Sequence, residues 1–277
     1  MKKSIIFFIA LVLLVGVFFL WQYFDIPRLE IILPEEKTKE EIPGRDLLLE
    51  VEERIEKEKI TEVRFICGVD TVEDTEGNIY ETVESRGRCW LDRNLGASRV
   101  AVSYNDAAAY GHLFQWGRFT DGHQIRNSRT TPNPSPFDKS GHSNFIIYGN
   151  YPYDWRIPQN DDLWQGVDGI NNPCPVGWRI PTAKEWEVEI ASWNSRDRTG
   201  AYASSLKIPV AGLRGVVDGI GMTGTSGYYW SSTVDRTWSW ADMEDQIQSK
   251  GLWITVGGAK TANYSRNLGL SVRCIRD

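Results

Sequence analysis

Residues 174–186 of this 277-residue chain read CPVGWRIPTAKEW, and they carry the clearest structural signal in the sequence. Thr182 and Glu185 have the spacing of a capping box directly after Pro181, which predicts that a helix begins here. The helix then presents one apolar face at helical spacing, made of Trp186, Ile190 and Trp193. Residues 194–195 are predicted to end it.

The sequence on either side of this helix favours short strands and turns. Apolar and polar residues alternate over 63–70, as in a strand. A turn signal at 76–78 separates this stretch from a second predicted strand at 79–83, and a third strand fits 88–91. Downstream, a glycine-rich tail with short strand-like pieces runs through residues 208–277.

A long loop system is predicted between the strands and the helix. Residues 128–172 are rich in Pro, Asn, Gly and Asp, which favour turns over regular structure. Trp155 and Trp164 lie inside this region and give it something to bury. We therefore expect the loops to be ordered and packed on the rest of the domain.

The N-terminus is typical of a membrane anchor. In residues 5–24 only Gln22 is strongly polar, and a helix of this length spans roughly 30 Å, the thickness of a bilayer core. Lys2 and Lys3 precede the run, so residues 1–4 are predicted to be a cytoplasmic tip and the following chain to lie outside the cytoplasm. A cleaved signal peptide is the alternative, although the apolar run is long and no small-residue cleavage site follows it.

A charged stalk is predicted to separate the anchor from a head domain. Residues 25–62 contain 7 basic and 13 acidic residues, so the stalk alone matches the net charge of −6 of the whole chain. Residues 46–59 have the pattern of a short helix, and the stalk is interpreted as a solvated spacer. The head, residues 63–277, is therefore close to neutral. The net charge of −6 of the whole chain argues against a general nucleic-acid binder.

Several further motifs lie before, within and after the predicted helix. They are Glu76-Gly77-Asn78-x-Tyr80-x-x-Val83 with Gly87, Trp90 and Asn94-Leu95; Cys174-Pro175-x-Gly177-Trp178-Arg179-x-Pro181-Thr182-x-x-Glu185-Trp186; and Pro209-x-Ala211-Gly212-x-Arg214, Tyr229-Trp230-Ser231-Ser232-Thr233 and Ser271-Val272-Arg273-Cys274. In order and spacing, this set resembles the Fibrobacter succinogenes major paralogous domain family over nearly the whole head. That family is similar to C-type-lectin-like folds on bacterial surface proteins. The resemblance implies an α+β domain with few helices and twisted antiparallel strands.

The four cysteines are expected to form two disulfides. Cys67 and Cys89 lie on neighbouring predicted strands, and both are additions to the family pattern, which suggests a bond between them. Cys174 and Cys274 would then join the middle of the head to its end, and an extracytoplasmic location permits such bonds. Four free thiols are the alternative. A zinc site is poorly supported because no C-x₂-C spacing occurs.

No catalytic signature is present in the sequence. It lacks a G-x-S-x-G elbow, a P-loop, a dinucleotide fingerprint and an H-E-x-x-H motif, so we expect no enzyme. The three histidines are widely spaced and are interpreted as hydrogen-bonded structural residues: His112, His123 and His142. An enzyme related to the cysteine-oxidising, formylglycine-generating folds stays an alternative, and it would need a free thiol.

One oxygen-rich loop offers a calcium site as an alternative to plain turn residues. Its candidate ligands are Asn160, Asp161, Asp162 and Asp168. The sugar-binding tripeptides of lectins, which contain a cis-proline, are missing. We therefore expect no cofactor and no metal.

The chain contains 12 tryptophans, and two of them lie among charged residues near the C-terminus. Residues 234–247 read VDRTWSWADMEDQI, and two indoles that are two residues apart share one face of a strand. Trp and Arg are frequent at the centres of binding surfaces. The predicted ligand-binding residues are Tyr229, Asp235, Arg236, Trp238, Trp240, Asp242, Trp253, Asn263, Tyr264, Arg266 and Asn267.

These features predict a single-pass cell-membrane protein whose extracytoplasmic head binds a protein or glycan through its C-terminal aromatic and polar face. The family resemblance adds that some members are targets of diversity-generating retroelements, which vary the ligand-binding face near the C-terminus. A structural envelope protein without a discrete ligand is the second hypothesis, and the cysteine-oxidising enzyme is the third.

Overall fold

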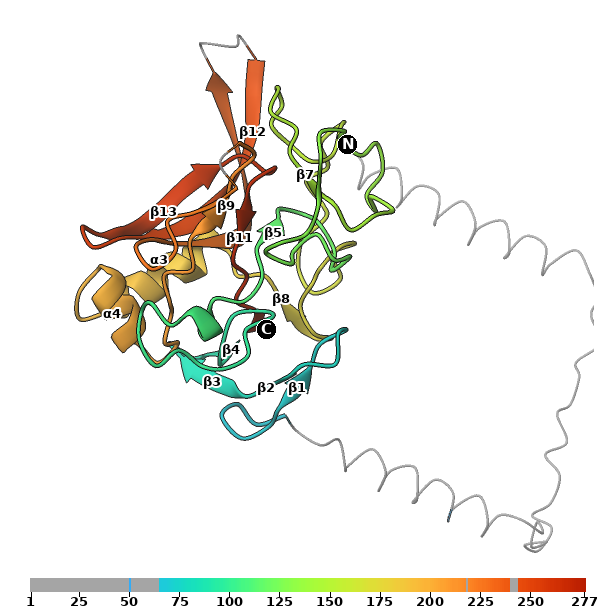
Figure 1. Cartoon of the computed structure of the whole chain (residues 1–277). Coiled ribbons are helices and arrows are strands. Elements are labelled where there is room, and N and C mark those ends of the chain that lie inside the picture. Colours follow the sequence, from blue (N-terminus) through green and yellow to red (C-terminus); the bar gives the residue numbers. More distant parts are fainter. Residues whose placement is uncertain (1–49, 51–64, 218, 240–243) are drawn as a thin grey trace, which may run out of the picture. The chain divides into compact units, whose positions relative to one another are not determined.

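The computed structural model describes Glu50 and residues 65–217, 219–239 and 244–277, with the side chains of 237–239 and 244–246 left aside. This part of the chain is rich in antiparallel strands and has few helices (Figure 1). The strand-rich α+β character expected from the sequence is therefore confirmed.

The predicted tip, anchor and stalk, residues 1–4, 5–24 and 25–62, lie outside the described residues apart from Glu50. Among the helices that the structure does describe, none has both the length and the apolar character that crossing a membrane requires.

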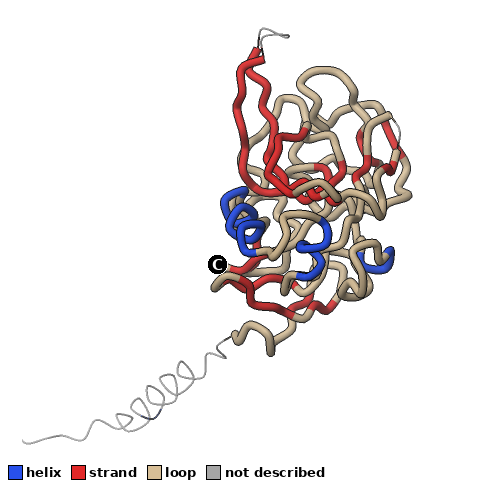
Figure 2. The backbone as a smooth tube through the Cα atoms, turned by 90° about the vertical axis from the view of Figure 1, so that its left-hand side faces the viewer, coloured by secondary structure: helices blue, strands red, loops and turns tan. Residues whose placement is uncertain are grey.

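The largest sheet has three antiparallel strands in the order β11, β12, β13. β11 spans Gly227–Ser239, β12 Glu244–Ile254 and β13 Ala259–Tyr264. β11 and β12 extend away from the helices in both views (Figures 1 and 2). Only short strands were expected in this part of the sequence, and that prediction was wrong. Backbone pairing continues through residues 234–239 and 244–249, although the sequence there shows little of the apolar alternation that signals a strand.

Two four-stranded sheets connect distant parts of the head. One has the order β10 (Ile220–Gly221), β9 (Leu213–Arg214), β14 (Gly269–Leu270), β5 (Phe114–Gln115). The other has the order β3 (Thr82–Ser85), β4 (Arg88–Leu91), β15 (Ile275–Arg276), β8 (Trp178–Arg179). Because β15 pairs with both β4 and β8, the last strand joins the beginning of the head to its middle.

Two small pairs complete the sheets of the described residues. β1 (Val72–Glu73) pairs with β2 (Ile79–Tyr80), and β6 (Thr130–Thr131) pairs in parallel with β7 (Phe145–Ile146). The last pair lies in the predicted loop region, which is otherwise loop and turn structure (Figure 2). Trp155 and Trp164 are buried in it, as expected.

The capped helix is confirmed as α3, Ala183–Ser192. The Thr182 side chain accepts from the Glu185 backbone N–H, and the Glu185 side chain accepts from the Thr182 N–H. The helix ends two residues before the predicted stop. A second helix, α4 (Arg198–Ala203), was not predicted; Asp197 caps it by accepting from two backbone N–H groups. One 3₁₀ turn, η1, covers Ala107–Ala109.

The Ser231–Thr233 part of the YWSST motif forms an irregularity that joins β11 to α3. The pairing register with β12 shifts between Trp230 and Val234. Within this shift, the Thr233 hydroxyl accepts from the Ala183 N–H at 2.9 Å, which satisfies one of the unpaired donors at the start of the helix. The motif is therefore explained by its structural role.

One predicted strand is not formed. The described residues of the stretch 63–70 make a turn, in which the backbone N–H groups of Val69 and Asp70 donate to the Ile66 carbonyl. The Asp70 carboxylate in turn accepts from the Ile66 N–H at 2.6 Å. Gly68 has a φ of +82°, a conformation that favours glycine and is incompatible with a strand. The second predicted strand is divided between β2 and β3.

Both expected disulfides are present. Cys67 bonds to Cys89 with a Cα–Cα distance of 5.7 Å, and Cys174 bonds to Cys274 at 5.8 Å. The second bond lies in the main core cluster, where both cysteines are buried. It links β15 and its neighbours to the segment that precedes α3.

The two disulfides should differ in what they contribute to stability. The Cys174–Cys274 bond closes a loop of 100 residues and the Cys67–Cys89 bond one of 22. Cys174→Ala with Cys274→Ala should therefore lower the free energy of unfolding by about 4–5 kcal/mol, against about 3 kcal/mol for the other pair. Urea unfolding of the two double variants measures both losses. A larger loss for Cys67 and Cys89 would contradict this ranking.

His123 is a fully buried histidine that lies just before the long loop region. Its Nδ1 lies 2.7 Å from Asp121 Oδ1, and its Nε2 accepts from the Gln115 backbone N–H at 3.1 Å. The accepting Nε2 identifies the ring as neutral, with the Nδ1–H donating to Asp121. Burial lowers the pKa of His123 to about 4.

This histidine predicts a loss of stability in acid. In the unfolded chain the His123 side chain takes up a proton as the pH falls below its ordinary pKa of about 6.5. In the native protein it stays neutral until about pH 4. The free energy of unfolding should therefore fall by roughly 3 kcal/mol as the pH drops through this window. In His123→Gln this contribution is absent. Denaturant unfolding curves of both proteins from pH 7 to about pH 4 test it, and parallel pH dependences would refute it.

Candidate functional site

β12 is the central strand of the largest sheet, and its alternation decides which side chains share a face. Successive strand residues point to opposite faces, whereas residues paired across strands share one. Trp253 pairs with Tyr228 of β11 and with Lys260 of β13. Four residues earlier on the same face, Ser249 pairs with Tyr264. We call this side the aromatic face, defined by Tyr228, Trp253, Lys260 and Tyr264.

The aromatic face combines half-buried rings with a positive charge. The rings of Tyr228 and Tyr264 meet edge to face with centroids 5.9 Å apart. The exposed Lys260 places its Nζ 5.2 Å from the centre of the Trp253 ring, within cation–π range. Burial raises the pKa of Tyr264 further above neutral, and its protonated hydroxyl can donate a hydrogen bond.

Gly251 leaves room on the aromatic face between Ser249 and Trp253 of β12. A Cβ at this position would lie 2.7 Å from the Tyr229 carbonyl oxygen and 3.1 Å from the Tyr264 ring. Real side chains do not tolerate the first distance. The glycine therefore lets the Tyr264 ring lie against the strand.

The structure places some of the predicted ligand-binding residues on the aromatic face. Trp253 and Tyr264 belong to it, and Arg236 joins it through its pairing with Ile247, which has the same parity in β12 as Trp253. The Arg236 side chain is 63% exposed, so its charge is available to a partner. These three residues come from three different strands.

Asp235 and Asn263 lie on the opposite face, so the predicted single patch was wrong on this point. Asp235 pairs with Gln248, and Asn263 pairs with Lys250, two residues of the other parity. The Asp235 carboxylate accepts from the Asn263 amide at 2.8 Å and lies 3.5 Å from the Lys250 ammonium. Strand alternation therefore separates them from Trp253 and Tyr264.

Tyr229, Arg266 and Asn267 are buried, which corrects their prediction as ligand contacts. The Tyr229 ring packs 5.8 Å from Trp186, and its hydroxyl bonds to the Pro209 carbonyl and to Asn94. The Asn267 amide donates to the Tyr148 carbonyl at 2.6 Å. These side chains hold the core together and do not face a partner.

Three predicted residues cannot be placed. The backbone of β11 passes through Trp238, but its side chain lies outside the described residues. Trp240 and Asp242 lie outside them entirely. The proposed pair of same-face indoles therefore stays a prediction.

Arg266 is a buried cation that binds a loop to the sheet. It donates to Ser249 Oγ at 3.0 Å and to Asp161 Oδ1 at 2.7 Å, and its guanidinium lies 4.1 Å from the centre of the Trp116 ring. The second Asp161 oxygen accepts from the exposed Arg236. Asp161 thereby connects the long loop both to β11 and to Arg266, two residues after the end of β13.

The candidate calcium loop is occupied by these ion pairs. The Asp161 carboxylate accepts hydrogen bonds from Arg236 and Arg266. The Asn160 amide donates to Asp138 at 2.9 Å. Across the described residues, no group of three or more His, Cys, Asp or Glu side chains is placed to hold a metal ion. The geometry therefore gives the calcium alternative no support.

Tyr228 and Lys260 belong to the site although the sequence analysis missed them. Tyr228 stands beside Tyr229 in the sequence, and only the register with β12 shows which of the two is in the core. Lys260 has no motif of its own and is brought to Trp253 by the pairing of β12 with β13. Strand alternation would have found the right tyrosine only once the register was known.

Comparisons with known proteins gave no match: no family model fits the chain, and neither a curated protein nor a solved structure is similar to it at the threshold applied.

All four cysteines of the chain are in disulfides. A reactive thiol, which the cysteine-oxidising alternative needs, is therefore not available in this state of the protein.

Arg266 should be essential for stability, whereas Arg236 should not. Arg266→Met would leave the buried Asp154, whose pKa burial already raises, without its cation and would leave Asp161 with the exposed Arg236 alone. Removing one partner of a buried ion pair costs about 3–5 kcal/mol. Arg236→Met removes an exposed partner of the same Asp161 and should cost less than about 1 kcal/mol. Denaturant unfolding measures both, and similar losses would contradict the assignment.

Proposed function

We propose that this chain is a membrane-anchored cell-surface recognition protein whose C-type-lectin-like head binds a protein or glycan through the aromatic face. It would belong to the Fibrobacter succinogenes major paralogous domain family, anchored by residues 5–24 and separated from the membrane by the stalk of residues 25–62. The antiparallel, helix-poor head supports this reading of the motifs. The motif tryptophans Trp90, Trp178, Trp186 and Trp230 are buried together with the motif cysteines, as core residues of such a domain would be.

The observation that carries the proposal is the aromatic face itself. Most tryptophans of the described residues are fully buried, whereas Trp253 is only half-buried and shares its face with two half-buried tyrosines. Large aromatic side chains beside exposed Lys260 and Arg236 have the composition of a binding hot spot. Aromatic rings also provide the stacking surfaces that sugars and apolar side chains use.

The extended hairpin favours the same site. β11 and β12 run past β13 and carry residues 234–239 and 244–249 outward. A partner on the aromatic face can therefore also reach Trp238 and Trp240 if these indoles share that face. The proposed diversification by a retroelement concerns this same C-terminal part, and a neighbouring reverse-transcriptase gene with an adenine-variant repeat of these codons would support it.

The recognition proposal predicts a loss of binding without a loss of folding. The full-length chain should bind at least one member of a glycan array or of an array of purified surface proteins. Trp253→Ala should weaken that binding by about tenfold or more, as expected for a hot-spot aromatic. Trp238→Ala with Trp240→Ala should do the same while the melting temperature changes little.

Phe137→Ala is the matched control because Phe137 is also aromatic and is 69% exposed, but it lies in the long loop. It should leave binding unchanged. Binding that survives the Trp253 and Trp238/Trp240 variants would reject the aromatic face as the site. The absence of any bound glycan or protein would instead favour a structural envelope protein.

A further inference from the structure

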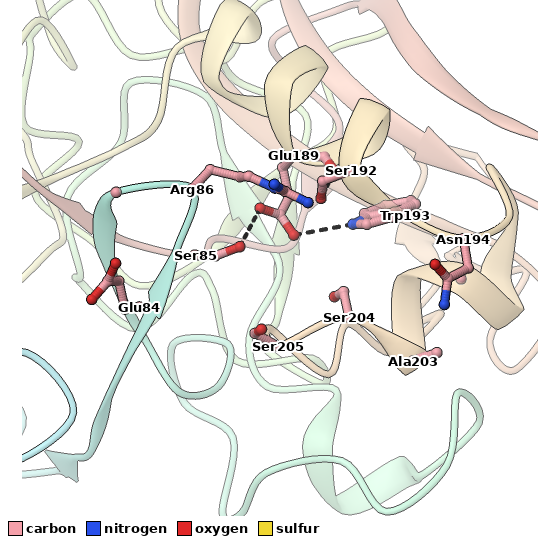
Figure 3. A pocket seen from close by; sticks show the side chains of 12 residues that line it. Glu84, Ser85, Arg86, Glu189, Ser192, Trp193, Asn194, Ala203, Ser204 and Ser205 are labelled. Carbon is pink, nitrogen blue, oxygen red and sulfur yellow. Dashed lines mark hydrogen bonds between the residues drawn. The ribbon is translucent and has the colours of Figure 1, made fainter.

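A pocket separate from the aromatic face lies between the β3–β4 turn and helices α3 and α4 (Figure 3). Its volume is about 490 Å³, within the range of small-ligand sites. The lining is mainly polar and includes Glu84, Ser85, Glu189, Ser192, Asn194 and Ser204. This region contains none of the residues predicted to bind a ligand, and it shares no residue with the aromatic face.

A buried carboxylate forms one wall of this pocket. Glu189 is 1% exposed, and Figure 3 shows its carboxylate directed between Ser85 and Trp193. One oxygen accepts from the Ser85 hydroxyl at 2.7 Å, and the other accepts from the Trp193 indole N–H at 3.0 Å. Because both neighbours are arranged as donors, Glu189 acts as an acceptor at both oxygens, which is the hydrogen-bonding pattern of a carboxylate.

Among the described residues no salt bridge involves this carboxylate, and the buried Arg273 acts on it only through a longer-range charge interaction. Each ion pair in that part of the chain involves another acid, and the arginine that lines the pocket, Arg86, is exposed to solvent and makes no ion pair with Glu189. A buried charge without a counter-ion in direct contact is costly unless something else compensates it. Two hydrogen bonds leave further lone pairs of Glu189 free for a ligand.

The remaining lining indicates what kind of cation would fit. Glu84 adds a second acidic side chain against the single arginine, Arg86, so the lining carries a net negative charge that disfavours an anionic ligand. The hydroxyl groups of Ser192, Ser204 and Ser205 and the amide of Asn194 offer donors and acceptors to a hydroxylated ligand. An alkyl amine would leave these groups unpaired, which costs affinity.

We propose that this pocket binds a small hydroxylated primary amine of the amino-sugar class, with its ammonium group paired to Glu189. The serine and asparagine side chains would hydrogen-bond the ring hydroxyls. This site is independent of the proposed recognition function, because it lies on different elements of the head and uses different chemistry.

Calorimetric titration of the full-length chain with glucosamine tests the proposal. Glucosamine should bind saturably, and glucose, which has the same ring but a hydroxyl in place of the ammonium, should bind at least about tenfold more weakly. Absence of saturable glucosamine binding, or equal binding of glucose, would overturn the proposal.

Glu189→Gln should reduce glucosamine affinity by about tenfold or more, because it removes the charge. The fold should be preserved, since the amide oxygen can accept from Trp193 while the amide nitrogen donates to the Ser85 hydroxyl. Glu187→Gln is the matched control on the same helix, because Glu187 is largely exposed and lies outside this pocket. It should leave the affinity unchanged.

Ala203→Lys provides a second variant that does not touch the buried carboxylate. Ala203 lines the pocket and is exposed, so a lysine there adds bulk and a competing ammonium without disturbing the core. It should lower glucosamine affinity even if Glu189→Gln proves unstable. Unchanged affinity in both Ala203→Lys and folded Glu189→Gln would show that the ligand, if bound, lies elsewhere, and would refute the site.

Discussion

Indole N–H groups that donate to backbone carbonyls of distant segments are the interaction on which this loop-rich head depends. Trp116 donates to the Ser231 carbonyl at 2.9 Å, and Trp230 donates back to the Phe114 carbonyl at 2.6 Å. Two further indoles extend this network. Trp155 of the long loop donates to the Trp116 carbonyl, and Trp186 of α3 donates to the Trp230 carbonyl. Each ring both fills the core and donates its N–H to a backbone carbonyl of another segment, which explains why so many tryptophans are buried.

The largest sheet packs on the core from both sides, and partly exposed aromatic rings remain on one of them. Tyr229, Leu252 and Ile254 pack with α3 in one core cluster. On the other side, Trp230 is buried in the main core cluster with Tyr228 and Tyr264 packed against it, and Arg266 and Asp161 attach the long loop. Trp253 and Lys260 lie beyond this packed part on the same side. Rigid elements that carry partly exposed aromatics are well suited to recognition, because the rings lose little conformational freedom on binding.

Local signals made part of this structure predictable. The capping box, the apolar helix face and both disulfide pairs follow from short-range patterns and from the family resemblance, and all were confirmed. The binding patch was only partly predictable, because choosing Tyr228 over Tyr229, or separating Asp235 from Trp253, requires the strand register. That register shifts at the irregularity after Trp230, and no local pattern shows how many residues it absorbs.

The role of the indole bonds is tested most directly by comparing the free energies of unfolding of Trp230→Phe and Trp253→Phe in urea. Trp230→Phe leaves the buried Phe114 carbonyl without its donor and creates a cavity, so it should cost about 2–4 kcal/mol. The Trp253 N–H is buried without a partner among the described residues, so Trp253→Phe should be neutral within about 0.5 kcal/mol or stabilising. Equal losses, or a larger loss for Trp253→Phe, would contradict the account.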